Sequence, residues 1–288
     1  MVKTTAYAKL DLGIEIYPEK LDDGYFPVRY IDCQIDLCDD LSFENQRGTL
    51  EVVCSEPSIL EKDNFVYKAA ILLREMVGNK NLGAKITLKK NIPVKAGFGG
   101  GSSDAAAAVR GLCKIWKIKP SENIISTMSD QLGKDFYYSW YGKLSEVAGN
   151  GKHYKIIPIS ANLPDLWLLV IVPREEKPST AWVYEHLKLN KDRRDSGKIE
   201  KLKEAILAGR KEKILKNLTN DFEEFVSSQF PVVGKMKKDL EKTGALRTIM
   251  AGAGLAVVGF FESKKNAQNA RDFLKERYSK VYISRSIS

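Results

Sequence analysis

The sequence predicts a mixed α/β (α+β) protein of two domains, and three observations support this. A strand pattern, a glycine-rich loop and an alanine-rich helix pattern follow one another between residues 84 and 108. A strand–helix–strand pattern, typical of a mixed α/β domain, lies between Leu255 and Arg285. The chain has 288 residues, 43% of them hydrophobic and 29% charged, which is enough for one large domain or two smaller ones. We place the division near residue 160, between domains of residues 1–160 and 161–288.

Local patterns predict the elements in chain order. Alternating apolar residues indicate strands, apolar residues at helical spacing indicate helices, and Asp22-Asp23-Gly24 indicates a turn. The expected elements are strands at 4–17, 28–37 and 84–90, a helix after Asn64, a helix that continues the glycine loop, a helix at about 121–132, an irregular region at 142–151, a strand at 167–172, helices at about 197–216 and 219–242, a strand at 255–261, a helix at 265–277 and a strand at 281–285.

The glycine-rich loop is the most informative segment, because it predicts a phosphate site. Four glycines fall within the five positions from Gly97 to Gly101, and Ser102, Ser103 and Asp104 follow before four alanines. Glycine lets the backbone approach a ligand closely, and the two hydroxyls and the carboxylate are expected as the cap and first turn of a helix. Unpaired N–H groups and the positive end of the helix dipole would then point at one place, which suits a phosphate.

Two common nucleotide motifs are excluded for this loop. It lacks the Gly-Lys-Ser/Thr that ends a P-loop, and Ser102 stands where a dinucleotide fingerprint needs its last glycine. The alternative is a structural turn before a capped helix, but a plain turn rarely needs four near-contiguous glycines.

Composition narrows the class of protein. No apolar run approaches the roughly 18 residues of a membrane helix, and the N-terminus has no signal-peptide pattern, so we expect a cytoplasmic protein without membrane contact. The four cysteines lack Cys-x-x-Cys spacing and the two histidines are scattered, which argues against a metal centre built from them. The net charge of +9 suits polyanionic small molecules, and no basic–aromatic interleaving indicates nucleic-acid binding.

Lys9 and Asp135 are candidates for phosphoryl transfer, which needs a group near the attacking hydroxyl and cations against the phosphate charge. Lys9 lies among apolar residues of the first expected strand. A lysine that points inward there must be paired, because an isolated buried ammonium is costly, and Asp135, expected at the end of a helix, is a candidate partner. The alternative is that both are surface charges. A second glycine turn, from Met250 to Gly254, is either structural or a further part of the site.

Nearly the whole chain resembles the GHMP kinases. The motifs that carry the resemblance are Ala8-Lys9-Leu10, Asp23-Gly24-Tyr25, Asp32 to Asp40, Asp63 to Ala70, Ile92-Pro93 with Ala96 to Ala106, Leu132 to Asp135, Gly142, Gly149-Asn150-Gly151, Ser179-Thr180, Asn220 to Glu223, Gly244-Ala245 and Met250 to Gly254. The resemblance implies two α/β domains with the active site in the cleft between them, and a kinase that uses ATP with Mg²⁺. Its branch of the family implies the 2-hydroxyl of a diphosphocytidyl-linked methylerythritol as acceptor, in non-mevalonate isoprenoid precursor biosynthesis. A monomer or homodimer is expected.

The resemblance also assigns roles to single residues. Asp135 would take or orient the proton of the acceptor hydroxyl, with support from Lys9, and Asn64 would lie by the adenine. Tyr25 would stack on the cytosine of the acceptor. The residues that the resemblance places at ATP are Asn64, Lys95, Ala96, Gly97, Phe98, Gly99, Gly100, Gly101, Ser102 and Ser103. Those that it places at the acceptor are Asp11, Tyr25, Phe26, Thr180 and Gly252.

The chain departs from the family pattern at several positions. Phe26 stands where the family usually has a histidine that helps read the cytosine edge, and Asp11 stands where asparagine is usual. Phe136-Tyr137-Tyr138 replaces Val-Pro-Phe, and Ala251 and Ala253 replace hydroxyl residues. Because losing a hydrogen-bond donor loosens specificity, these changes bear on the acceptor more than on the kinase chemistry. Three functions stay open: the cytidyl-substrate kinase, a GHMP kinase for another small alcohol or phosphorylated alcohol, and a non-catalytic nucleotide-binding regulator.

Overall fold

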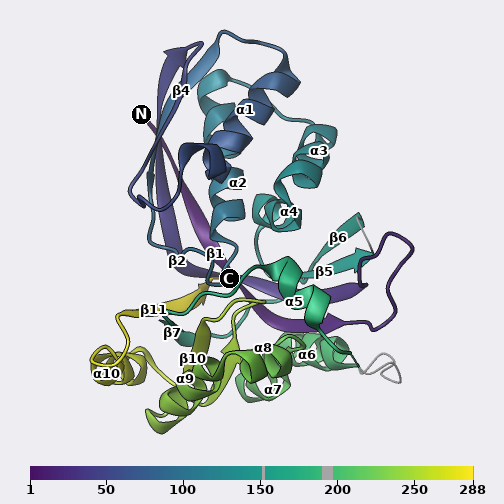
Figure 1. The fold of residues 1–288 in the computed structure, drawn as a ribbon, viewed down its shortest axis with the longest axis vertical. Helices are drawn as coiled ribbons and strands as arrows, with labels where there is room; N and C mark the ends of the chain where they lie inside the picture. Colours follow the sequence, from purple (N-terminus) through teal and green to yellow (C-terminus); the bar gives the residue numbers. More distant parts are fainter. Residues whose placement is uncertain (151–152, 190–196, 288) are drawn as a thin grey trace. The chain divides into compact units, whose positions relative to one another are not determined.

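The computed structural model describes residues 1–150, 153–189 and 197–287, and Figure 1 labels its elements. The chain forms two compact units that interleave along the sequence. The first unit consists of Met1–Lys9, Leu37–Val94 and Gly99–Gly142, and the second of Leu10–Asp36, Lys95–Phe98 and Lys143–Ser288. The predicted boundary near residue 160 concerns the two domains of the family and not these compact units, and it stays a prediction.

Strands β1 (Val2–Ile16) and β2 (Val28–Arg47) contribute residues to both units. The other elements of the first unit are β3 (Leu50–Cys54), the 3₁₀ helix η1 (Glu61–Asp63), α1 (Phe65–Val77), β4 (Leu82–Lys89), α2 (Gly100–Trp116), α3 (Glu122–Leu132) and α4 (Lys134–Tyr141). The other elements of the second unit are β5 (Ser145–Asn150), β6 (His153–Pro158), β7 (Trp167–Val172), α5 (Thr180–His186), α6 (Lys198–Leu207), α7 (Lys211–Asn217), β8 (Thr219–Asn220), α8 (Glu223–Gln229), α9 (Pro231–Lys242), β9 (Arg247–Met250), β10 (Val257–Phe261), α10 (Lys264–Leu274) and β11 (Lys280–Ile287).

The first unit packs helices on a sheet in which β4 pairs antiparallel with β2 and parallel with β3. Helices α1 and α2 lie against one face of these strands (Figure 1). The alanine run of α2, from Ala105 to Ala108, is fully buried, so small side chains let the helix approach the sheet closely. Gly111 extends this close contact, because a Cβ there would lie 2.3 Å from the ring of Phe43 on β2.

The second unit contains the antiparallel strand order β11-β7-β10-β9. Strand β5 pairs with β2, and β8 pairs in parallel with β1. Strand β7 has the bounds that the sequence predicted, and all of its residues after Trp167 are buried, as expected of a strand between two neighbours. Helices α9 and α10 pack on this sheet through Met236, Leu240 and Leu274.

Several sequence predictions of elements are wrong. Strand β2 runs to Arg47 instead of ending near residue 37, because alternate side chains from Leu37 to Phe43 remain buried. The region after Gly142 is not irregular, since it contains β5; Gly151 lies outside the described residues. The expected helix at 219–242 is divided at Phe230, because Pro231 lacks an N–H group and favours the first position of a new helix. The expected helix at 197–216 is divided into α6 and α7, and Gly209 between them has φ 63°, which ends a helix. Strands β3, β6, β8 and β9 and helices η1, α4 and α5 were not predicted, since they are short and carry weak patterns.

Every helix within residues 1–150, 153–189 and 197–287 is too short or too polar to cross a bilayer.

Candidate active site

Lys9 and Asp135 form an ion pair within the first unit. The Nζ atom of Lys9 lies 3.6 Å from Oδ1 of Asp135, so the pairing that the sequence analysis considered is present. Lys9 lies on β1 and is 8% exposed, and its aliphatic stem passes so close to Gly99 that a Cβ there would lie 3.0 Å from Cγ. The Asp135 side chain is 49% exposed. The pair therefore combines a fixed ammonium with a carboxylate that a ligand can reach.

Asp135 occupies the beginning of a helix and not the end of one, which corrects the sequence prediction. Helix α3 ends at Leu132, and α4 begins at Lys134 after Gly133, whose φ is 98°. Only glycine adopts this conformation readily, so the chain can turn sharply there. The turn places Asp135 in the first turn of α4.

Helix α2 begins earlier in the glycine loop than expected. Its N-cap is Gly99, with φ 62°, and Gly100 and Gly101 are already helical. The prediction that a hydroxyl caps the helix is therefore wrong, since no side chain provides a cap hydrogen bond, but Ser102 and Ser103 do lie in its first turn. The first N–H groups of a helix lack intrahelical partners, and here they belong to residues from Gly99 to Ser102. Free N–H groups at a helix start can donate hydrogen bonds to an anion such as phosphate.

Close packing explains why the loop contains glycines inside the helix. A Cβ at Gly100 would lie 2.9 Å from Cγ2 of Ile92, and one at Gly101 would lie 3.3 Å from the ring of Phe65. Ser103 ties the helix to β1, because its hydroxyl donates a 2.7 Å hydrogen bond to the carbonyl of Tyr7. The start of α2 is thus anchored on its inner side.

Asn64 is the N-cap of α1 and is 3% exposed. Its Oδ1 accepts a 2.9 Å hydrogen bond from the N–H of Val66. A capping asparagine stabilises a helix by satisfying one of its free N–H groups. The side chain therefore has a structural role, and its place beside adenine stays a prediction.

In the second unit, Lys95–Phe98 packs on the second glycine turn, backbone to backbone. Gly97 has φ 98°, and a Cβ there would lie 2.0 Å from the carbonyl oxygen of Ala251. A Cβ at Gly254 would lie 2.4 Å from the carbonyl oxygen of Ala96. The backbones of the two glycine segments are therefore in direct contact, and neither Gly97 nor Gly254 leaves room for a side chain there.

Asn220 holds the second glycine turn, and the sequence analysis gave it no role. Its Nδ2 donates to the carbonyls of Met250 at 2.9 Å and Gly252 at 2.8 Å, and its Oδ1 accepts from the N–H of Phe222 at 3.0 Å. Glu223 accepts a 2.8 Å hydrogen bond from the N–H of Met250. The Asn-Asp-Phe-Glu run marks a turn before a helix, but no local pattern reveals partners that lie 30 residues away.

Asp11 lies beside this turn. It is 1% exposed, and a Cβ at Gly252 would lie 3.2 Å from its Oδ2 and 3.1 Å from the carbonyl oxygen of Gly97. The structure thus brings together three predicted residues, Asp11, Gly97 and Gly252, within the second unit.

The predicted acceptor aromatics lie at the turn between β1 and β2. Tyr25 is 46% exposed and closes the turn by accepting a hydrogen bond from the N–H of Leu21. The Phe26 ring stacks on Tyr184 with centroids 6.2 Å apart, and the hydroxyls of Tyr184 and Tyr30 are 2.7 Å apart. Burial raises the pKa of Tyr30 well above its usual value, so its hydroxyl stays protonated. Tyr184 was not among the predicted residues.

Two further predicted residues, Thr180 and Lys95, are near the surface, whereas Phe98 is buried. Thr180 begins α5, the helix that also carries Tyr184, and its Oγ1 accepts from Nζ of Lys177 at 3.4 Å. Lys95 has φ 57° and forms an exposed ion pair with Glu176 at 3.2 Å. Exposed pairs of this kind contribute little to stability.

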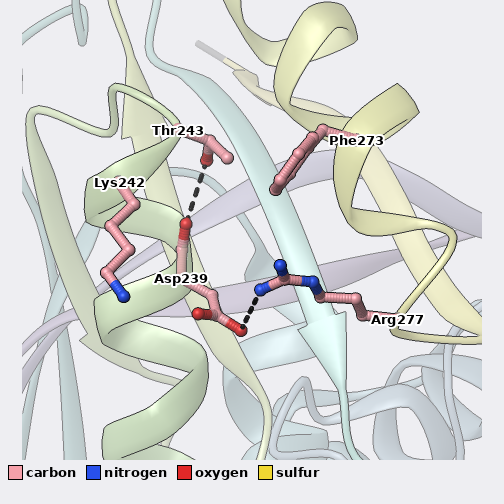
Figure 2. A pocket seen from close by; sticks show the side chains of 5 residues that line it. All are labelled: Asp239, Lys242, Thr243, Phe273 and Arg277. Carbon is pink, nitrogen blue, oxygen red and sulfur yellow. Dashed lines mark hydrogen bonds and ion pairs between the residues drawn. The ribbon is translucent and has the colours of Figure 1, made fainter.

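A hollow of about 260 Å³ lies between α9 and α10 (Figure 2). The Thr243 hydroxyl donates to the carbonyl of Asp239 at 3.3 Å, and Nη1 of Arg277 lies 3.6 Å from Oδ2 of Asp239. None of the site residues predicted from the sequence lines this hollow, so the hollow is not part of the candidate active site. Its lining residues are Asp239, Lys242, Thr243, Phe273 and Arg277.

Comparison with known proteins identifies the family. Residues 64–143 match the description "GHMP kinases N terminal domain" and residues 202–280 match "GHMP kinases C terminal". A 4-diphosphocytidyl-2-C-methyl-D-erythritol kinase of Caldicellulosiruptor bescii is 36% identical, covering 98% of this chain and 97% of the relative. The chain belongs to the GHMP kinase family. A protein of the same name from Enterococcus faecalis is 32% identical to this GHMP kinase, over 98% of each chain.

Solved structures agree with this family assignment. A crystal structure of 4-(cytidine 5'-diphospho)-2C-methyl-D-erythritol kinase matches with a TM-score of 0.82 and 25% identity, over all of both chains. The L. major mevalonate kinase matches with a TM-score of 0.76 over 99% of this chain and 96% of its own, but at 16% identity it shows the fold alone. The predicted mixed α/β fold, with the N- and C-terminal domains of a GHMP kinase, is confirmed. Membership implies the use of ATP.

Proposed function

We propose that this GHMP kinase transfers the γ-phosphoryl group of ATP to the 2-hydroxyl of 4-diphosphocytidyl-2-C-methyl-D-erythritol, in non-mevalonate isoprenoid precursor biosynthesis. The observation that carries the proposal is full-length similarity to kinases of that name, at 36% and 32% identity. The ion pair of Lys9 and Asp135 supports the chemistry, because phosphoryl transfer to an alcohol needs a proton acceptor beside a cation.

Asp135, Lys9 and the start of α2 have separate roles in the proposed phosphoryl transfer. Asp135 orients the acceptor hydroxyl and takes its proton while the hydroxyl oxygen attacks the γ-phosphorus. The bond to the oxygen that bridges the β- and γ-phosphates breaks, and ADP leaves. Lys9 holds Asp135 in place and offsets negative charge near the transferred group. The free N–H groups of Gly100, Gly101 and Ser102 donate hydrogen bonds to the ATP phosphates.

Mg²⁺ accompanies ATP in this chemistry and neutralises phosphate charge. Among the residues for which the structure gives positions, no group of three or more His, Cys, Asp and Glu side chains could hold a metal ion. We therefore propose that the ion binds chiefly through phosphate oxygens and water, as Mg²⁺ commonly does in kinases.

Replacing Lys9 by methionine is expected to lower kcat by about 10²-fold, because the variant keeps the apolar stem and loses the charge that faces Asp135. Steady-state kinetics with saturating ATP and acceptor will measure this. Lys3, which is exposed on the same strand, provides the control, and Lys3→Met should leave kcat unchanged. Equal rates for Lys9→Met and the unmodified enzyme would remove Lys9 from the mechanism.

A second candidate acceptor, another small alcohol or phosphorylated alcohol, is favoured by the aromatic cluster. Phe26 cannot hydrogen-bond a base edge, and its ring is engaged by Tyr184 at 6.2 Å and by the Lys20 ammonium at 5.0 Å. A site that lacks a polar reader discriminates less strongly between bases. Family membership leaves the non-catalytic regulator without support.

ADP release with a panel of acceptors tests the two candidates. We expect turnover with the cytidyl compound and none above background with mevalonate or free sugars. No turnover of the cytidyl compound, together with rapid turnover of another alcohol, would replace the first candidate by the second.

A further inference from the structure

Lys90 directly follows β4, and its ammonium is buried between two carboxylates of the first unit. Its Nζ atom lies 2.5 Å from Oδ2 of Asp39 and 2.6 Å from Oδ2 of Asp104. The side chains are 6% exposed for Lys90, 0% for Asp39 and 4% for Asp104. We call these three residues the Lys90 cluster. No sequence pattern indicated a role for Lys90 or Asp39.

The cluster is costly to disturb. Burial alone would lower the pKa of Lys90, but the carboxylates of Asp104 and Asp39 raise it above its usual value, so the ammonium stays charged. Removing one member of a buried ion pair leaves the other charge without compensation. Such a cluster therefore holds its backbone segments in one arrangement.

These segments meet at the start of α2. Asp39 lies on β2, and its Oδ1 accepts hydrogen bonds from the N–H groups of Asn91 and, at 2.8 Å, Ile92. Asp104 lies one helical turn after Gly100. A Cβ at Gly100 would lie 3.4 Å from Nζ of Lys90 and 2.9 Å from Ile92, so the ammonium lies directly against the first turn of the helix.

We propose that the Lys90 cluster positions the free N–H groups at the start of α2 for the ATP phosphates. Lys90, Asp39 and Asp104 are positioning residues, because they act through the backbone of Gly100 to Ser102. This inference rests on the proposed role of that helix start in binding ATP. It goes beyond the proposed function by naming what aligns the binding groups.

The contribution of Asp104 is an oxygen that accepts a hydrogen bond. Its Oδ1 has no hydrogen-bond partner among the residues that the structure describes, and Oδ2 accepts from Lys90. An asparagine at this position keeps an acceptor oxygen of the same reach, whereas alanine removes it.

Calorimetric titration with a non-hydrolysable ATP analogue tests the proposal. We expect Lys90→Met and Asp104→Ala to weaken analogue affinity by about tenfold or more, and Asp104→Asn to stay within about threefold of the unmodified enzyme. Kinetics should show a raised KM for ATP and an unchanged KM for the acceptor. Lys85→Met is the control, because Lys85 lies on β4 and forms an exposed pair with Glu51 at 3.0 Å.

The proposal is overturned if Lys90→Met and Asp104→Ala lower the melting temperature but bind the analogue as tightly as the unmodified enzyme. If Lys90→Met does not fold, Asp104→Ala decides, since it leaves the pair of Lys90 and Asp39 in place. Analogue binding needs no acceptor, so a failure to phosphorylate the cytidyl compound would refute the proposed function and leave this test intact.

Discussion

Asp135→Asn is expected to lower kcat by about 10³-fold or more while affinity for ATP stays within about twofold of the unmodified enzyme. The amide has nearly the shape of the carboxylate, so Lys9 keeps a polar neighbour, but it cannot take the proton of the acceptor hydroxyl. The carboxylate is 49% exposed and projects from the first turn of α4, so the substitution leaves the core unchanged. Single-turnover kinetics and calorimetry separate the chemical step from binding.

Asp130→Asn is the matched control for that variant. Asp130 is exposed on α3, and the same change of charge there should leave both kcat and ATP affinity unaltered. If Asp135→Asn turns over as fast as the control, Asp135 is neither the proton acceptor nor the group that orients the hydroxyl.

Gly97→Ala is expected to destabilise the protein by about 2–5 kcal/mol and to weaken ATP binding by about tenfold. The added Cβ would lie 2.0 Å from the carbonyl oxygen of Ala251, and φ at this residue is 98°. The segment must leave the second glycine turn or distort it, and it continues directly into the helix start whose N–H groups we propose as phosphate donors. Denaturant titration measures the free energy of unfolding, and calorimetry measures the affinity.

Gly244→Ala separates backbone strain from the steric clash. Gly244 has φ 92°, but in the described part of the chain no atom beyond its two neighbours in sequence lies within 4 Å of a Cβ placed there. We expect it to cost about 1–2 kcal/mol from backbone strain alone and to leave ATP affinity unchanged. Equal losses of stability and affinity in both variants would contradict the view that the contact with Ala251 fixes the loop.

Sequence patterns predicted those parts of the fold that depend on local chemistry. Alternation identified β1 and β4, and the buried run of Trp167–Val172 identified β7 with its bounds. The alternation of apolar residues in β2 also continues past Leu37, but the charged Asp39 interrupts it. Without knowledge of the cation that pairs with Asp39, the sequence there is typical of a turn. That partner, Lys90, lies 51 residues further along the chain.

Local sequence patterns predicted part of the candidate site, but not the contacts between distant segments. A lysine among apolar strand residues left two alternatives, a buried and paired cation or a surface charge, and the pairing with Asp135 is present at 3.6 Å. The hydroxyls of Ser102 and Ser103 favoured a conventional cap, but Gly99 ends the loop in a left-handed conformation and the helix begins earlier. The roles of Asn220, Tyr184 and Lys90 depend on contacts between distant segments, which no periodicity encodes.

A crystal structure with a non-hydrolysable ATP analogue tests most directly whether the start of α2 binds the triphosphate. We expect phosphate oxygens within hydrogen-bond distance of the N–H groups of Gly100, Gly101 and Ser102. A fully occupied analogue whose phosphates contact other residues, with this helix start free, would contradict it.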